Sequence, residues 1–397
     1  MTTSNANIYL GIIFFLVLLS GCNATSNNTQ LSPPPNFALE YSFKTLPVET
    51  PTEIFVLSED IKQQLDSAFP PTKRNLQSTR KLLRFLLENG DESLSYQSGA
   101  TLIANQAYND LNANCLSLSI LAYSMAEHLG MDTQFQQVHI PEYWALNKGY
   151  NLLTSHINLR ISQPLNKGSN IKHVYNSLDS VVIDFDPNSR GEKFQTSNIS
   201  KARITAMFYN NKGVIAMLNR QYDLAYSYFG AATKTDNHYS SAWGNLAVLF
   251  RITNQFKDAE LAYNYALEAN KDNHTALGNL ALLYQLTDRN EQASEILTSL
   301  DKKRQSNPYY HVSLGNTAYK NNDYRDAIKH YHKAKRLDKK LHDSYFGLAK
   351  TYYQLGDFKH AYKQLRLANK YADFKHDKER YQSKLAVLSN MTAKVSD

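Results

Sequence analysis

The feature of this sequence that most constrains its fold is an alanine that recurs every 34 residues in the second half of the chain. The alanines are Ala225, Ala259, Ala293, Ala327 and Ala361, with no insertion between them. Twelve residues before each stands a small residue: Gly213, Ala247, Ala281, Gly315 and Ala349. Four residues after each stands a bulky one: Phe229, Tyr263, Leu297, Tyr331 and Leu365. Such a period predicts stacked copies of one small unit, each unable to bury its apolar face alone.

The alternation of small and bulky positions resembles the tetratricopeptide repeat (TPR) over residues 205–371, including Trp243 and Leu246 in the second copy. The third copy is the poorest match, with Asn290 and Leu300 at two pattern positions. The resemblance implies an all-α superhelix of five helical hairpins, which we assign to residues 201–371. Residues 372–397 are expected to form a C-terminal capping helix, because the exposed end of such a stack needs a polar cover.

The repeat pattern also predicts which side chains face the concave groove of the superhelix. They form a mixed polar and aromatic set with no clamp of a single charge sign, which suits hydrogen bonding to an extended protein or peptide partner. A plain solvated surface is the alternative interpretation for each of them. The candidates are Arg251, Gln285, Asn316, Tyr319, Lys350 and Tyr353.

The N-terminus has the features of a lipoprotein signal peptide, assigned to residues 1–22. The apolar run Ile8–Leu19 is too short to span a bilayer core of ~30 Å, and it ends in the lipobox Leu19-Ser20-Gly21-Cys22. Acyl chains on Cys22 would hold the protein to a membrane surface. No Lys or Arg precedes the run, so an uncleaved anchor or an earlier start site are the alternatives. Similarity to Gram-negative lipoproteins with Asn after the cysteine implies the outer membrane, facing the periplasm.

Residues 23–52 are polar at first and then contain Pro33-Pro34-Pro35, which predicts a flexible tether. Beyond the tether the charge is uneven. Residues 1–200 hold 13 Lys and Arg against 17 Asp and Glu, while residues 201–397 hold 30 against 19. A basic second half is compatible with an anionic partner or with an ordinary solvated face. Nucleic acid is not expected as the partner of an exported lipoprotein.

Once lipidation accounts for Cys22, Cys115 is the one remaining thiol in the sequence. It opens a predicted helix, where unpaired backbone N–H groups and the helix dipole favour a thiolate. Two predicted strands follow, and their alternation places His156 on one face of the first. On the second strand Asp184 and Asp186 share a face, so either could orient an imidazole.

Three short motifs resemble the transglutaminase-like superfamily over roughly residues 55–195, and we assign residues 53–200 to such a domain. The motifs are Asn114-Cys115-Leu116-Ser117, Ser155-His156-Ile157-Asn158-Leu159 and Val181-Val182-Ile183-Asp184-Phe185-Asp186-Pro187. The resemblance implies an α+β papain-like fold with the cysteine on a helix and the His and Asp on an antiparallel sheet. The superfamily includes bacterial lipoproteins with TPRs behind this domain. The sequence departs from many members in lacking a Trp shortly before the aspartate, and Asp184 is favoured with Asp186 as the alternative.

The resemblance implies acyl chemistry at a Cys-His-Asp site. Cys115 would attack a carboxamide or peptide carbonyl, His156 would move the proton, and Asp184 would hold the imidazole tautomer. Water as the acceptor gives an amidohydrolase or peptidase, and an amine gives an acyltransferase; the sequence leaves this open. Oxyanion candidates are Asn112, Asn114 and Gln106.

Two functions of different class remain at this point. The first is a lipid-anchored cysteine enzyme acting on envelope peptide, with the repeats recruiting substrate. The second is an inactive transglutaminase-like fold that serves with the repeats as an interaction scaffold. The chain has no HExxH, CxxC, P-loop or GxGxxG motif, so neither a metal nor a cofactor is expected.

Overall fold

The structure is a computed structural model that describes residues 31–39, 42–70, 81–82, 101–110, 113–138, 145–147, 150–152, 156–162, 180–185, 195–372 and 375–394. By its contacts the chain divides into residues 1–33 and residues 34–397. The first unit lies almost wholly outside the described residues, and so does the expected lipidation site Cys22. In the described ranges no helix is both long enough and apolar enough to cross a membrane.

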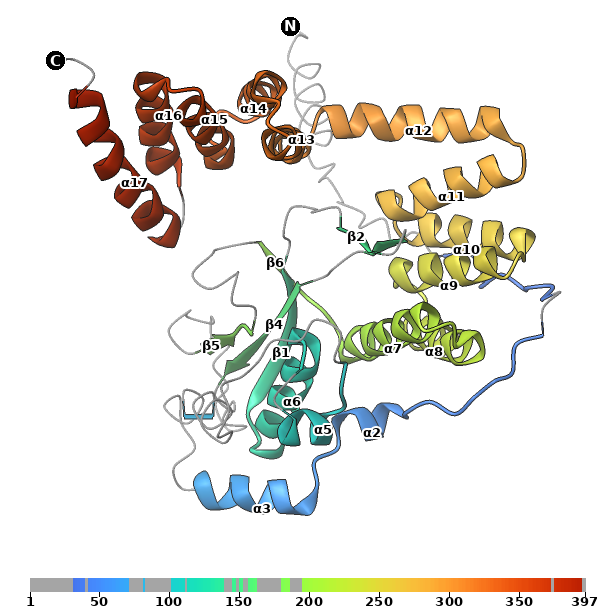
Figure 1. Cartoon of the computed structure of the whole chain (residues 1–397). Helices are drawn as coiled ribbons and strands as arrows, with labels where there is room; N and C mark the ends of the chain where they lie inside the picture. The colour runs from blue at the N-terminus through green and yellow to red at the C-terminus, as the bar shows by residue number, and fades with distance from the viewer. Residues whose placement is uncertain are drawn as a thin grey trace, which may run out of the picture. The chain divides into compact units, whose positions relative to one another are not determined.

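An α+β region precedes the repeats (Figure 1). Its sheet has the order β5-β4-β1-β6, and every neighbouring pair runs antiparallel. A separate hairpin pairs β2 with β3. The helices are α2 (Pro51–Phe55), α3 (Glu59–Ala68), α5 (Ala104–Asn109) and α6 (Cys115–His128). The strands are β1 (Asp132–Val138), β2 (Ala145–Asn147), β3 (Tyr150–Leu152), β4 (His156–Ser162), β5 (Ser180–Ile183) and β6 (Thr196–Asn198).

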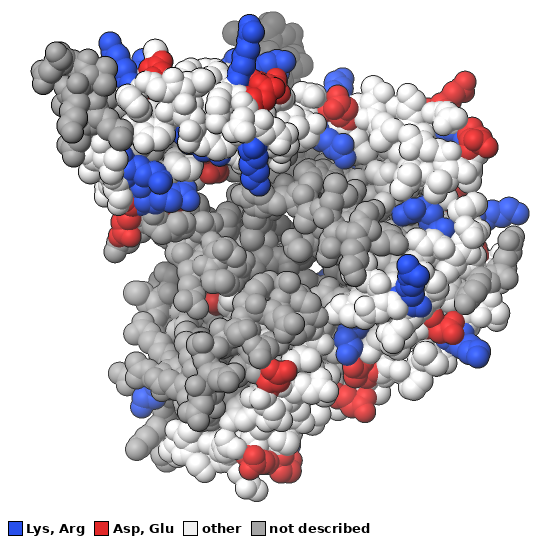
Figure 2. Space-filling model, in the orientation of Figure 1, with Lys and Arg blue, Asp and Glu red and all other residues white. Residues whose placement is uncertain are grey.

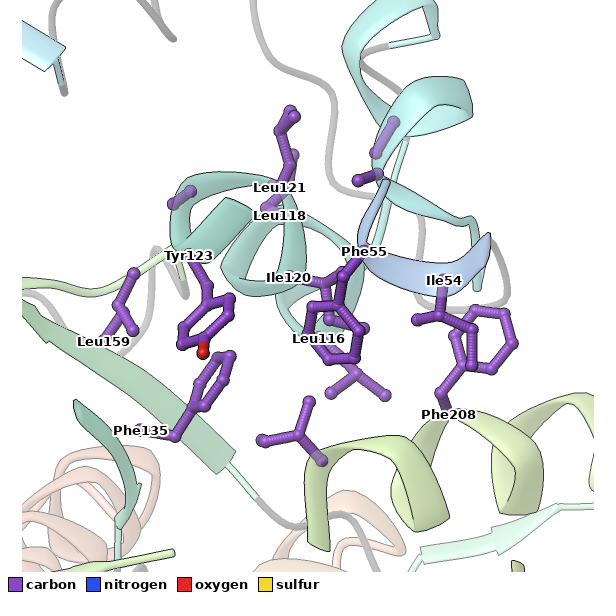
Figure 3. Packing of buried hydrophobic residues seen from close by; sticks show 14 of the residues in the cluster. Ile54, Phe55, Leu116, Leu118, Ile120, Leu121, Tyr123, Phe135, Leu159 and Phe208 are labelled. Carbon is purple, nitrogen blue, oxygen red and sulfur yellow. The ribbon is translucent and has the colours of Figure 1, made fainter. Parts of the chain in front are cut away.

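The helix α6 is the centre of this region, because it is apolar on nearly all sides and packs on both β1 and β4. Tyr123 of α6 stacks on Phe135 of β1 with ring centroids 4.7 Å apart, and Leu159 of β4 pairs with Phe135 (Figure 3). On its other side α6 contacts Ile54 and Phe55 of α2 through the same buried cluster (Figure 3). The predicted helix and strands are therefore present, while the papain-like arrangement itself stays a prediction.

The repeats form ten helices, as the 34-residue period predicts. Each hairpin joins its two helices through a residue of positive φ, again at 34-residue spacing: Arg220, Asn254, Asp288, Asn322 and Gly356. The hairpins are α7 (Lys201–Leu218) with α8 (Tyr222–Thr235), α9 (Ser240–Ile252) with α10 (Phe256–Ala269), α11 (His274–Leu286) with α12 (Asn290–Gln305), α13 (Pro308–Lys320) with α14 (Tyr324–Leu337), and α15 (His342–Gln354) with α16 (Phe358–Tyr371).

The small and bulky positions of the pattern meet inside the hairpins. A Cβ added at Gly213 would lie 2.6 Å from the Phe229 ring, and one at Gly315 would lie 2.7 Å from the Tyr331 ring. The third hairpin departs from this rule, because Leu297 keeps 39% of its surface exposed. Leu300, one turn later, is buried instead. The poorest repeat in sequence is therefore also the least regular in packing.

The C-terminal cap is present as α17 (Lys375–Lys394), which packs on α16. Tyr381 of α17 is fully buried, and its ring lies 5.0 Å from that of Phe346 in α15. A helix thus covers the end of the stack, within the residues 372–397 assigned to the cap, and it begins at Lys375.

The expected tether is the main difference between prediction and structure. Residues 37–50, here called the strap, run extended along α7, α8, α9 and α10; residues 40 and 41 of the strap are outside the described part. The composition of residues 23–52 predicted a flexible tether, but the strap carries aromatic anchors at Phe37 and Phe43. Its end is fixed by a capping box in which Thr50 and Glu53 start α2. For residues 37–39 and 42–50 the structure therefore shows a segment held on the repeats and not the predicted flexible tether.

Candidate functional site

The six groove candidates, here called the polar row, lie near the C-terminal ends of α9, α11, α13 and α15. Three of them form one cluster across two repeats. Lys350 donates a hydrogen bond of 2.8 Å to Asn316 Oδ1, and its ammonium lies 4.4 Å from the centroid of the Tyr319 ring. Asn316 and Lys350 are 34 residues apart, so the contact joins equivalent positions of successive repeats.

The positive charge of this cluster, the Lys350 ammonium, is half-buried. Burial lowers the pKa of Lys350, the nearby positive charge of Lys320 lowers it further, and Asp343 opposes the shift. A half-buried ammonium held over an aromatic ring keeps part of its attraction for anionic or carbonyl groups, because few water molecules compete. The cluster can therefore bind a carbonyl or carboxylate of a polypeptide.

The remaining members of the polar row are separate from this cluster. Arg251 lies beside Tyr263: burial raises the pKa of Tyr263 to about 12, and the charge of Arg251 opposes that shift. Within the described part, Arg251 Nε and Tyr263 Oη are buried without a hydrogen-bond partner. Gln285 is exposed, and Tyr353 is 38% exposed.

Tyr331 belongs to the site but was predicted only as a packing residue. Its ring is fully buried, yet its hydroxyl donates a 2.7 Å hydrogen bond to Asn316 Oδ1. The ring fits because both Gly315 and Gly347 face it without a side chain. Gly347 is the residue in the sequence that could have indicated this contact. Glycine inside a helix lowers the stability of the helix, so its presence there suggests that a neighbouring side chain needs the space.

Cys115 is the first residue of α6, as predicted. Asn114 caps the helix: its Oδ1 accepts from the backbone N–H and the hydroxyl of Ser117, and its Nδ2 donates to Thr101. The whole Asn114 amide is thus engaged in holding the helix start. Cys115 is half-buried against the main core.

The other two oxyanion candidates are Gln106 and Asn112. Gln106 lies exposed on α5, and Asn112 is outside the described residues. An oxyanion role for these side chains stays a prediction.

His156 and Asp184 lie on neighbouring strands of the sheet that packs on α6. His156 is the first residue of β4 and pairs with Val138. Asp184 directly follows β5, which pairs with β4, whereas Asp186 is outside the described residues. The structure places the three expected catalytic positions on adjacent elements, and contact among their side chains remains part of the proposal below.

In the described ranges no three His, Cys, Asp or Glu side chains gather as metal ligands would. On the face shown in Figure 2, basic side chains are spread over the helical array, with acidic ones between them.

Four family models match the chain, all of them in its second half. Three described as tetratricopeptide repeat match residues 210–274, 253–314 and 342–373, and one described as TPR repeat matches residues 315–356. Together with the five helical hairpins, these matches identify residues 210–373 as an array of TPRs. No curated protein matches the chain in sequence.

Several solved structures are similar to the chain over part of its length. YrrB, a TPR protein with an unusual peptide-binding site, is 14% identical over 45% of this chain and 92% of its own, with a TM-score of 0.24. PilF of Pseudomonas aeruginosa is 16% identical over 49% and 94%, with a TM-score of 0.26. MamA of Desulfovibrio magneticus RS-1 is 12% identical over 42% and 94%, with a TM-score of 0.24. Scores this low carry no argument about function.

Proposed function

We propose that this chain is an envelope lipoprotein whose TPR array binds an extended segment of a protein partner along the polar row. The observation that carries the proposal is the cluster of Asn316, Tyr319 and Lys350, which presents a half-buried cation, an amide and an aromatic face at equivalent points of two repeats. Helical repeat arrays offer such surfaces to peptides. A lipid on Cys22 would hold the array at the outer membrane, facing the periplasm.

Site-specific photocrosslinking tests this proposal. A photoreactive amino acid is placed at Gln285 or Tyr353, which are exposed on the row. Matched controls carry it at Leu261 or Val387, which are also exposed but lie on α10 and α17. We expect the row positions to capture one and the same envelope polypeptide and the controls not to capture it. Equal capture at both sets of positions contradicts the proposal.

A second candidate function is cysteine acyl chemistry, favoured by the position of Cys115 at the start of α6. The helix α6 packs on β4, which begins at His156, and Asp184 directly follows β5, the neighbour of β4 in the sheet. In this function the Cys115 thiolate attacks an amide carbonyl of the bound polypeptide. His156 accepts the thiol proton and gives it to the leaving amine, and Asp184 or Asp186 orients the imidazole. Water or a second amine then takes the acyl group from sulfur.

Alkylation kinetics separate this enzyme from an inactive scaffold. We expect iodoacetamide to label Cys115 at about pH 6 faster than it labels a free cysteine, and the His156→Ala variant to lose that excess. A rate equal to that of free cysteine in both proteins leaves the scaffold as the function. The alkylation rates test only the enzyme, so neither outcome changes what the crosslinking experiment says about partner binding.

A further inference from the structure

The strap contacts the first two repeats as a bound peptide does. Ala38 and Leu39 each donate a backbone hydrogen bond of 2.9 Å to Asp258, one to each carboxylate oxygen. Leu39 has a positive φ of 48°, and a left-handed residue in such a pair turns successive N–H groups toward one anion. Asp258 is 2% exposed, in the first turn of α10.

Two aromatic anchors flank this backbone contact. Phe37 packs 4.8 Å from the ring of Phe250 in α9. Phe43 stacks on Tyr226 of α8 at 4.5 Å, with the two rings nearly parallel. Both phenylalanines are only half-buried, so they lie on the repeats rather than within their core.

The C-terminal part of the strap adds polar contacts on the first repeat. Leu46 N donates to Ser227 Oγ at 2.8 Å. Glu49 accepts from Tyr228 at 2.8 Å and lies 3.2 Å from the Lys212 ammonium. The repeats thus bind backbone groups of the strap at several points and three of its side chains, those of Phe37, Phe43 and Glu49. Extended peptides are recognised by the same combination of contacts.

The surface beneath the strap matches the polar groups of an extended peptide. A buried carboxylate such as Asp258 is costly unless it is hydrogen-bonded, and the strap supplies both bonds from backbone groups that any sequence has. The polar contacts lie on α7, α8 and α10, whereas the polar row lies on α9, α11, α13 and α15. Phe37 also packs on Phe250 of α9, the helix that carries Arg251 of the polar row. The site is separate from the cluster of Asn316, Tyr319 and Lys350, which lies on α13 and α15.

We propose that this surface is a second peptide-binding site, occupied in cis by the strap and open to exchange with another extended peptide. That peptide has an aromatic residue, two free backbone N–H groups directly after it, a second aromatic residue six positions on, and a carboxylate twelve positions on. The strap then acts as a built-in competitor that a better ligand displaces.

The test measures fluorescence anisotropy of a labelled synthetic peptide of residues 34–50 against the full chain. In a chain with Phe37→Ala and Phe43→Ala the cis strap is weakened, and we expect the peptide to bind about tenfold more tightly than to the wild type. Adding Asp258→Ala to that chain should weaken binding by about tenfold, while adding Asp272→Ala, on an exposed turn of the same repeat, should leave it unchanged. Equal affinity for wild-type and weakened chains, or equal effects of the two aspartate changes, overturns the proposal.

Hydrogen exchange of the wild-type chain gives a readout that needs no variant. We expect the strap to detach locally, so that the backbone amides of Ala38 and Leu39 exchange while those of α8 and α10 stay protected. Exchange of the strap only together with α8 and α10 means that the strap is a fixed part of the fold, and the proposal then fails.

Discussion

At the residue scale, Tyr331 links the packing of the repeats to the polar row. Its ring fills the space left by Gly315 and Gly347, and its hydroxyl holds Asn316 in the orientation that also accepts from Lys350. The 34-residue pattern predicted the buried ring. It could not predict the hydroxyl contact, because the pattern gives which positions are buried and not which polar atom on the paired helix a side chain meets.

Substitution of Gly347 tests this fit. A Cβ there would overlap the Tyr331 ring, so we expect Gly347→Ala to lower the free energy of unfolding by about 1–3 kcal/mol. Gly244 is also within a helix, but a Cβ there meets its nearest atoms at 3.9 Å. Gly244→Ala should therefore raise stability by up to about 1 kcal/mol. Urea unfolding of both variants checks the prediction, and equal effects of the two changes would show that the Tyr331 ring does not need the space.

Glu49 should make the stability of the chain dependent on pH. Burial alone would raise the pKa of Glu49, but hydrogen bonds from backbone and Tyr228 together with the charge of Lys212 outweigh it, so the pKa is lowered. A carboxylate with a lowered pKa in the folded state stabilises above its unfolded pKa, and loses that contribution as the pH falls through the folded value.

The measurement compares urea unfolding of wild type and Glu49→Gln. The stability difference should be largest at about pH 7 and should shrink below about pH 4. Glu59→Gln is the control, because its partner Lys62 holds it in an exposed pair on α3. A difference for Glu49→Gln that does not change with pH contradicts the assigned contacts.

At the scale of single elements, sequence reasoning worked where a helix or strand has a local signal. The start of α6 at Cys115, the alternation of buried Ile157, Leu159 and Ile161 in β4, and the capping helix all follow from nearby residues. The strap could not be predicted in this way, because a segment outside helices and sheets has no period of its own. Its partners lie 160 to 220 residues away in the sequence. Long-range contacts of this kind leave no local pattern to read.

The cap of α6 gives a test at this scale. Asn114 is buried and joins Ser117 to Thr101, so we expect Asn114→Ala to cost about 1–2 kcal/mol of stability. Ser58 occupies the same position before α3 without a side-chain cap bond, and Ser58→Ala should change stability by less than about 0.5 kcal/mol. Thermal unfolding of the two variants distinguishes them. A stable Asn114→Ala variant would mean that other contacts hold the helix start at Cys115.

At the scale of the whole molecule, the repeat array is not uniform. The helix α12 contributes only Ala293 and Leu300 to buried packing, and α12 contacts α13 less than the corresponding helices of the other repeats contact their neighbours. Stability in a repeat array is close to a sum of repeat and neighbour terms, so a weak interface divides it. The sequence marked the third copy as the poorest match to the pattern, but the weak contact between α12 and α13 arises from side-chain fit that the period does not contain.

Hydrogen exchange by mass spectrometry should show this division. We expect backbone amides of α12 to exchange faster than those of α10 and α16, which are the second helices of better-packed hairpins. Uniform protection across these three helices would contradict the weak interface.

The central claim is that the polar row binds a protein partner, and the most direct test is the equilibrium affinity of the polypeptide captured by crosslinking at Gln285 and Tyr353. Lys350→Met removes the ammonium from the cluster and keeps its length, whereas Lys384→Met removes a charge that is exposed on α17. The account predicts that Lys350→Met weakens binding by about tenfold and that Lys384→Met leaves it nearly unchanged. Equal affinities of the two variants and the wild type would contradict it.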